Sequence, residues 1–325
     1  HPHGDVYSED EQKKCLSIFS FWNPPGNDVG IHWAKAQEMN QPLEVAIACV
    51  VDPVIQVAAA TSIPFGLDEM DFAGGLRGEP VDVVDCETID IAVPAKAEWI
   101  LEGTFLPERD VAIGPHSNPV GYYDDAQLFP LIEIQSITHR KNPIWYSTME
   151  MEPPFDHNYM ACLPIEGEVL SDLQSKIPEV QDVVVTPNLS YFVQLSVDGA
   201  QKPRPDFGKF VVQSVWDASG RWGKTAKVVV VVGPDVNPYD LSEIEWAINT
   251  RVQPYTDSII NKSGHAFLMD PSAEKDPGHG IALQSEQIGF DATIKIPERF
   301  QSYPEYSNAD AKDVEAIAEK FKGLL

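Results

Sequence analysis

The stretch Lys227-Val-Val-Val-Val-Val232 most constrains the fold, because five consecutive valines leave no polar face on the strand that they form. A continuous apolar strand is typical of a sheet that is buried on both faces. A loop and a helical pattern at 241–249 follow directly. This succession predicts an α/β arrangement in the carboxy-terminal half of the chain.

The patterns before this run also alternate between helix and strand. Helices are expected at 166–176 and 209–218, and strands at 183–186 and 191–196. Residues 45 to 150 are instead rich in strand patterns that are separated by turn signals. The strands expected there are 44–51, 81–84, 89–93, 99–106 and 131–139, with helices at 53–60 and 68–76.

The segment Glu102–Tyr123 gathers turn-forming residues and two aromatic residues in one run. Its turn formers are Gly103, Gly114, Pro115, Pro119 and Gly121. Glycine permits a positive φ and a close approach of the backbone to a bound group. Two interpretations stay open: a functional loop built around a ligand, and the tip of a long surface hairpin.

Several short motifs of the chain resemble the UbiD family of decarboxylases and carboxylases. Members of that family carry Ile-Val-Leu-Glu-Gly, then Glu-Gly-Pro-Phe-Gly-Glu, then Gly-Tyr-Tyr. The corresponding segments here are Trp99-Ile-Leu-Glu-Gly103, Ile113-Gly-Pro-His-Ser-Asn118 and Gly121-Tyr-Tyr123. Further motifs in family order are Ser62-Ile-Pro-Phe-Gly-Leu-Asp-Glu69, Ala73-Gly-Gly-Leu-Arg-Gly78, Asp235-Val-Asn-Pro-Tyr-Asp240, Glu245-Trp-Ala-Ile-Asn-Thr-Arg251 and Gly289-Phe-Asp-Ala-Thr293.

The resemblance implies an α+β chain with three parts. Residues 1–155 would form the split β-barrel that the family shares with flavin reductases, with the usual amino-terminal domain absent or truncated. Residues 156–309 would form an α/β oligomerisation domain. Residues 310–325 carry apolar side chains at helical spacing, which predicts an amphipathic helix that docks either on a neighbouring subunit or on its own domain.

The catalytic residues of the family do not match this chain. In the family, the two glutamates of Glu-Gly-Pro-Phe-Gly-Glu act with an upstream arginine beside prenylated FMN, and one glutamate supplies the proton that replaces carbon dioxide. Ile113 and Asn118 stand at these positions, and neither side chain exchanges a proton near pH 7. No arginine precedes Arg77. The resemblance therefore predicts a degenerate active site, in which His116 or Asp124 would have to take over proton transfer.

The resemblance also identifies positions for the cofactors of the family, which are prenylated FMN with Mn and K. The metal-binding histidine falls near Asn23 or Asn27, and the metal-binding glutamate falls on Glu69. An acidic residue at a helix start also suits the helix dipole, so Glu69 has a purely structural interpretation too. Arg221 is the nearest match to a basic residue beside the cofactor phosphate. The chain alone is expected to bind prenylated FMN weakly or not at all.

Charge and composition exclude some classes of function. The formal net charge of −27 argues against binding to nucleic acid or to an anionic membrane surface. No run of 18 apolar residues predicts a transmembrane helix. The four cysteines form no C-x-x-C pair, which fits reduced thiols and a cytoplasmic protein.

Three functions remain open. The first is an accessory or non-catalytic UbiD-like subunit of an aromatic-acid carboxylase or decarboxylase complex, similar to phenylphosphate carboxylase. Its partner would be a catalytically complete UbiD-like subunit, with a homo-oligomer as the alternative. The second is a self-sufficient carboxy-lyase with altered acid and base groups. The third is a flavin-binding or assembly module without chemistry of its own.

Overall fold

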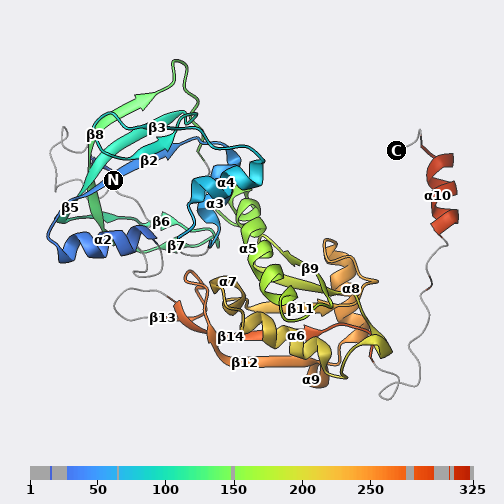
Figure 1. Cartoon of the computed structure of the whole chain (residues 1–325). Helices are drawn as coiled ribbons and strands as arrows, with labels where there is room; N and C mark the ends of the chain where they lie inside the picture. Colours follow the sequence, from blue (N-terminus) through green and yellow to red (C-terminus); the bar gives the residue numbers. More distant parts are fainter. Residues whose placement is uncertain are drawn as a thin grey trace.

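The computed structural model describes residues 15–16, 28–63, 66–147, 151–275, 282–295, 307 and 311–322. Figure 1 shows two sheet-containing parts, joined by the long helix α5 (Asp156–Gln174), and a separate helix α10 (Ala311–Lys320). No helix in these ranges is long and apolar enough to cross a membrane.

The first part is built on a four-stranded antiparallel sheet with the strand order β1-β8-β5-β2. These strands are β1 (Cys15–Leu16), β2 (Leu43–Cys49), β5 (Trp99–Ile113) and β8 (Gln127–His139). Helix α2 (Asp28–Glu38) packs on it, with the rings of Trp33 and Phe105 5.4 Å apart. The described strands form an open path from β1 to β2, so the expected closure into a split barrel is not confirmed.

Two helices and a short ribbon complete the first part. Helices α3 (Pro53–Ala60) and α4 (Glu69–Arg77) contact each other, and each begins after an aspartate that accepts a backbone N–H. Gly78 ends α4 with a φ of +78°, the left-handed conformation that suits glycine after a helix. Strands β3 (Val83–Asp85) and β4 (Ala92–Pro94) pair as an antiparallel ribbon. The expected helix at 53–60 is confirmed. The other elements expected in this part shift by at most four residues at either end, except that the strand expected at 99–106 extends to residue 113.

The second part holds a mixed sheet with the strand order β12-β14-β11-β10-β9, and β13 pairs with β14. Its strands are β9 (Val180–Val185), β10 (Ser190–Leu195), β11 (Val228–Val232), β12 (Ser258–His265), β13 (Glu274–Lys275) and β14 (Ala282–Asp291). Strands β10, β11 and β14 run parallel to one another. Its helices are α5, α6 (Phe207–Trp216), α7 (Arg221–Lys224), α8 (Leu241–Arg251) and α9 (Pro254–Asp257), with a 3₁₀-helix at Gly199–Gln201.

The valine run is buried on both faces of this sheet, as the sequence predicts. Val229 and Val231 belong to the larger core with α5 and α6, whereas Val230 and Val232 belong to the core under α8. The side chains of Val229 to Val232 are at most 1% exposed. Successive residues of a strand point to opposite faces, so one run of valines fills both cores.

The structure corrects two expectations about element boundaries. Helix α5 begins at Asp156, ten residues before the expected start, because Pro164 inside it masks the helical pattern. Residues 102–113 form the second part of strand β5 and do not belong to a loop. The turn formers Gly114 to Gly121 alone make the connection, so the hairpin interpretation describes this segment better.

Candidate active site

The tip of the β5–β8 hairpin holds Asn118, His116 and Asp124, three of the residues that the sequence leads us to consider for a catalytic site. A small ribbon, β6 (His116–Ser117) paired with β7 (Tyr123–Asp124), forms this tip. It packs against the start of α5, where the amide of Asn158 donates a hydrogen bond of 2.9 Å to the carbonyl oxygen of Pro119. A Cβ at residue 121 would lie 3.0 Å from the Cα of Glu152, and Gly121 has a φ of +85°. Only glycine therefore fits this contact without strain.

Asn118 organises the tip of the hairpin. Its side chain is 2% exposed, and its Oδ1 accepts the backbone N–H groups of Val120 (3.2 Å) and Tyr122 (3.0 Å). Its Nδ2 donates to Oδ1 of Asp124 at 3.2 Å. The backbone N–H of Asn118 donates to the carbonyl oxygen of Tyr122. Both ends of the amide are thus engaged in holding the turn, and a neutral amide cannot move a proton there.

Ile113 lies at the end of β5, opposite Gln127 of β8. Its half-buried side chain packs against the apolar cluster that includes Phe105, Phe129 and Trp33. This position therefore contributes packing between the sheet and helix α2. An acidic side chain in the same orientation would enter an apolar environment, where burial disfavours its charged form.

His116 and Asp124 stand directly opposite each other in the β6–β7 ribbon. The structure thus brings the two substitute acid–base candidates to the same place in the fold. The side-chain placement of His116 lies outside the described part of the structure. Asp124 is half-buried, and its carboxylate accepts the Asn118 amide. Asp124 therefore participates in the same turn as Asn118.

The remaining predicted site residues are spread over other elements. Glu69 is the first residue of α4 and is half-buried. Arg221 is the first residue of α7, and nothing is described of its side chain. Asn23 and Asn27 lie outside the described residues. Within the described ranges, no three His, Cys, Asp or Glu side chains gather in a way that could hold a metal ion.

Sequence reasoning missed a buried carboxylate within a recognised motif, Glu102 on β5. This side chain is 1% exposed and accepts hydrogen bonds from the backbone N–H of Glu87 (3.0 Å), the backbone N–H of Thr88 (2.7 Å) and the hydroxyl of Thr88 (2.6 Å). Burial raises the pKa of Glu102, but the three donors outweigh it, and the net pKa is lowered. Glu102 is therefore charged in the folded chain, and its hydrogen bonds hold the connection at 86–91 against strand β5.

A second buried polar centre lies where the parallel strands β10, β11 and β14 end. Arg251 is 3% exposed and donates two hydrogen bonds to Asp235, of 3.1 and 2.7 Å. Its Nη1 also lies 3.9 Å from Oδ2 of Asp198. A Cβ at residue 233 would lie 1.9 Å from the same Oδ2, which explains the glycine that follows the valine run. Burial raises the pKa of Asp198 to about 6, and nearby Asp235 adds to this rise.

Two buried lysines, Lys202 and Lys295, complete this centre. Lys202 donates to the hydroxyl of Thr293 at 2.8 Å. The ammonium of Lys295 lies 3.3 Å from Asp291 and 3.9 Å from Asp257. All five side chains are at most 5% exposed. Ligands often bind at the carboxyl ends of parallel strands. Here side chains of opposite charge occupy this place and compensate one another.

Comparison with protein families identifies both parts of the chain. The model of the 3-octaprenyl-4-hydroxybenzoate carboxy-lyase Rift-related domain (UbiD) matches residues 17–153. The model of the carboxy-terminal domain of the same carboxy-lyase matches residues 158–292. An uncharacterized protein of Synechocystis sp. is 34% identical over 292 residues, which cover 89% of this chain and 56% of that protein.

Two solved enzymes share the fold. The UbiD-class enzyme HmfF of Pelotomaculum thermopropionicum, in complex with FMN, is 27% identical with a TM-score of 0.80 over 94% of this chain and 64% of its own. An evolved form of HmfF is dimeric and is in complex with prFMN. The vanillic acid decarboxylase ShVdcCD of Sedimentibacter hydroxybenzoicus, in open form, is 26% identical, with a TM-score of 0.78 over 96% of this chain and 64% of its own.

These similarities extend over both sheets. Two residues of the shared motifs, Glu102 and Arg251, are buried and hydrogen-bonded within the fold. The chain spans between about half and two thirds of the length of the relatives that it matches. The chain therefore belongs to the UbiD family of carboxy-lyases.

Proposed function

We propose that this chain is an accessory subunit of an aromatic-acid carboxylase or decarboxylase complex and does not exchange carbon dioxide by itself. The observation that carries this proposal is the use of Asn118. Its amide is buried and engaged in hydrogen bonds to the backbone of the hairpin tip and to Asp124. A side chain that holds the turn in this way has no proton to give at the position where the family places a glutamate.

The described residues do not fit the cofactors of the family. Ile113 packs into an apolar cluster, and Glu69 belongs to no group of three or more described His, Cys, Asp or Glu side chains that could hold a metal ion. Manganese prefers several oxygen or imidazole donors, and one carboxylate provides a weak site. No step of a reaction is therefore derived through prenylated FMN or a metal in this chain.

One observation favours a self-sufficient carboxy-lyase instead. His116 and Asp124 occupy paired positions of the β6–β7 ribbon, close to where the family places its acid. A histidine near its ordinary pKa could exchange a proton at neutral pH. Under this alternative, His116→Ala abolishes activity of the isolated chain. Under the accessory-subunit proposal, the isolated chain has no activity to lose.

The proposal of a partner rests on exposed apolar surface. The apolar side chains of α10, Val314, Ile317 and Phe321, are 53%, 58% and 42% exposed. The helix lies away from both sheets (Figure 1). An amphipathic helix gains its stability by burying such a face. We expect α10 to dock on a catalytically complete UbiD-like subunit, or on a second copy of this chain in a homo-oligomer.

Copurification tests the proposal. The full chain is tagged, purified from its native cells and weighed by native mass spectrometry, and carbon dioxide exchange is assayed before and after the partner is removed. We expect a hetero-oligomer with a chain that carries both glutamates, and exchange activity that leaves with that chain. Recovery of an active lone monomer would overturn the proposal. In that case, His116→Ala beside the matched exposed change His139→Ala tests the alternative.

A further inference from the structure

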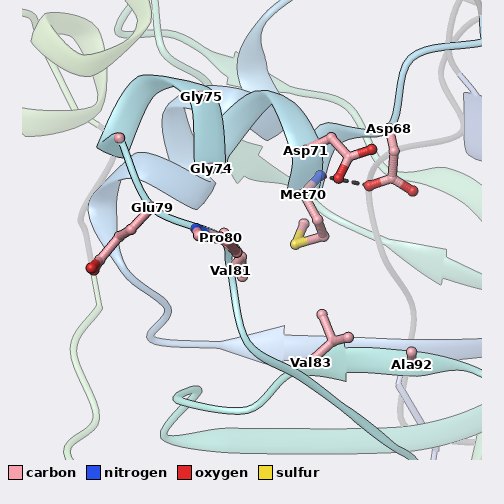
Figure 2. A pocket seen from close by; sticks show the side chains of 11 residues that line it. Asp68, Met70, Asp71, Gly74, Gly75, Glu79, Pro80, Val81, Val83 and Ala92 are labelled. Carbon is pink, nitrogen blue, oxygen red and sulfur yellow. Dashed lines mark hydrogen bonds between the residues drawn. The ribbon is translucent and has the colours of Figure 1, made fainter.

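An open cavity of about 730 Å³ lies between helix α4 and the β3–β4 ribbon, away from the hairpin tip. Figure 2 shows Met70 and Asp71 on the helix side and Val83 and Ala92 on the ribbon side. Gly74 and Gly75 also line it, so the helix presents bare backbone at its centre. The cavity is therefore bounded by a helix surface on one side and by a strand on the other.

The polar lining of the cavity is acidic. Asp68, Asp71 and Glu79 are exposed carboxylates, and none of the described residues that line the cavity is a lysine, arginine or histidine. Asp68 uses one oxygen to cap α4, accepting the N–H of Met70 at 2.7 Å. The nearby Arg77 is shared between Asp52 at 3.0 Å and Glu79 at 3.3 Å. The cavity thus keeps an excess of negative charge, which favours a cationic occupant.

Strand β3 has a free edge beside this cavity. The N–H of Ala95 donates to the carbonyl oxygen of Asp82, and the N–H of Cys86 donates to that of Ile91. Hydrogen-bonded pairs alternate along an antiparallel ladder, so Asp82, Val84 and Cys86 face β4. The backbone groups of Val83 and Asp85 consequently point away from β4. β3 pairs with no other described strand.

The ribbon is also unusually apolar for an exposed edge. Val83 and Val84 are 48% and 49% exposed. Val83 and Ala92 lie on the same face, which is the floor of the cavity (Figure 2). An exposed strand with a free edge and β-branched side chains is a template for an added strand. The carboxylates that line the cavity favour an added strand with basic side chains.

We propose that β3 accepts an extended, basic segment of another protein as a third strand of the ribbon. Main-chain hydrogen bonds to Val83 and Asp85 hold this segment, and alternate side chains enter the cavity toward the acidic groups of α4. We assign this edge to another protein and not to a second copy of this chain, because a second copy of the ribbon would bring the same carboxylates to an acidic cavity. This inference does not depend on whether the chain is catalytic.

A labelled hexapeptide, Lys-Val-Lys-Val-Lys-Val, tests the proposal by fluorescence anisotropy with the full chain. The peptide Glu-Val-Glu-Val-Glu-Val is the charge control. We expect the basic peptide to bind and the acidic one not to bind. The double change Asp71→Asn with Glu79→Gln should weaken binding about tenfold. The matched double change Asp125→Asn with Glu133→Gln, which removes two exposed carboxylates elsewhere, should leave it unchanged.

The strand geometry has its own test. Val83→Pro removes an outward N–H that β4 does not use, so the ribbon keeps its ladder while peptide binding weakens about fivefold. Val83→Lys places a cation on the floor of the cavity and should weaken binding of the basic peptide as well. This variant replaces the proline variant in the test if the proline variant does not fold. Equal binding of the acidic peptide, or full binding by folded Val83→Pro and Val83→Lys, overturns the proposal. So does self-association of the chain that Val83→Lys abolishes.

Discussion

The hairpin tip and the ends of the parallel strands make opposite use of polar side chains. At the tip, where the resemblance to the UbiD family places two glutamates, this chain has an isoleucine in an apolar cluster and a buried amide that holds a turn. At the strand ends, buried Arg251 and Lys295 lie beside aspartates, which range from buried Asp291 to exposed Asp235, and the opposite charges compensate one another. Neutral residues stand where chemistry is expected, and charged residues stand where structure needs them.

The difference teaches that buried charge is a poor sign of catalysis in this fold. Arg251, Asp235 and Asp198 lie at a position where many α/β proteins bind ligands. Their charges are directed at one another, so the site is already filled by its own side chains. A functional interpretation needs a group that can change its protonation or contact a ligand, and neither Ile113 nor Asn118 can change its protonation near neutral pH.

Among the changes that test this comparison, removing Arg251 should lower the free energy of unfolding most. Arg251→Ala removes a buried guanidinium that pairs with exposed Asp235 and half-buried Asp198, and because solvent reaches both aspartates we expect a cost of about 3 kcal/mol of the free energy of unfolding, at the low end for a buried pair. Arg204→Ala is the matched control, because Arg204 makes a similar contact of 2.6 Å with Asp206 but is about half exposed. Its cost should be much smaller, because solvent screens an exposed ion pair. Urea unfolding measures both, and equal costs would contradict the account.

Glu102→Gln should have the next largest effect, at the base of the hairpin. Three donors converge on this carboxylate, and an amide can accept with only one oxygen, so at least one donor loses its partner. We expect a loss of about 2 kcal/mol. Glu133→Gln on neighbouring β8 is exposed and should cost less than about 0.5 kcal/mol. A Glu102 variant as stable as the Glu133 variant would show that the carboxylate is not structural.

The pH dependence of stability should report on Asp198. Its pKa is raised from 3.8 to about 6 in the folded chain, so the folded state holds the proton more tightly. The stabilisation is present below pH 3.8 and is lost as pH rises through about 6. Between pH 5 and pH 8 this loss amounts to about 1.4 kcal/mol. Asp198→Asn should remove that slope from urea unfolding measured across the range, and an unchanged slope would contradict the assignment.

Asn118→Ala should have the smallest effect of the four. The change removes an acceptor for two backbone N–H groups at a tip that is partly open to solvent, so we expect a loss of about 1 kcal/mol. Exposed Asn249, which donates one bond within α8, offers a matched Asn→Ala control with a smaller loss. Thermal unfolding compares the two. Stabilisation by Asn118→Ala would refute a structural role for this amide.

Sequence predicted some strands of each sheet and missed others, for physical reasons. The valine run can only be buried on both faces, so its two cores followed from the pattern. Strand β5 continues past a glycine, a proline and several charges because β8 pairs with it on both sides of the irregularity between Phe105 and Asp110, and local pattern cannot show such pairing. Strands β12 and β14 were missed because their exposed polar residues hide the apolar alternation.

The sequence predicted where some candidate residues lie, and their role in a site stays a prediction. Glu69 was expected at the start of a helix and is the first residue of α4, whereas Ile113 was expected in a loop and lies at the end of strand β5. The hydrogen bonds of Asn118 depend on the conformation of the tip, which a residue list does not contain. The buried Glu102 was visible only as an acid within an apolar strand.

Flavin content is the most direct test of the central claim that the chain keeps the family scaffold but not its chemistry. The chain is coexpressed with a flavin prenyltransferase and purified away from other subunits, and the bound flavin is measured by absorbance and by mass spectrometry. We predict far less than one prenylated FMN per chain and no carbon dioxide release from aromatic acids. One flavin per chain together with decarboxylation would contradict the account.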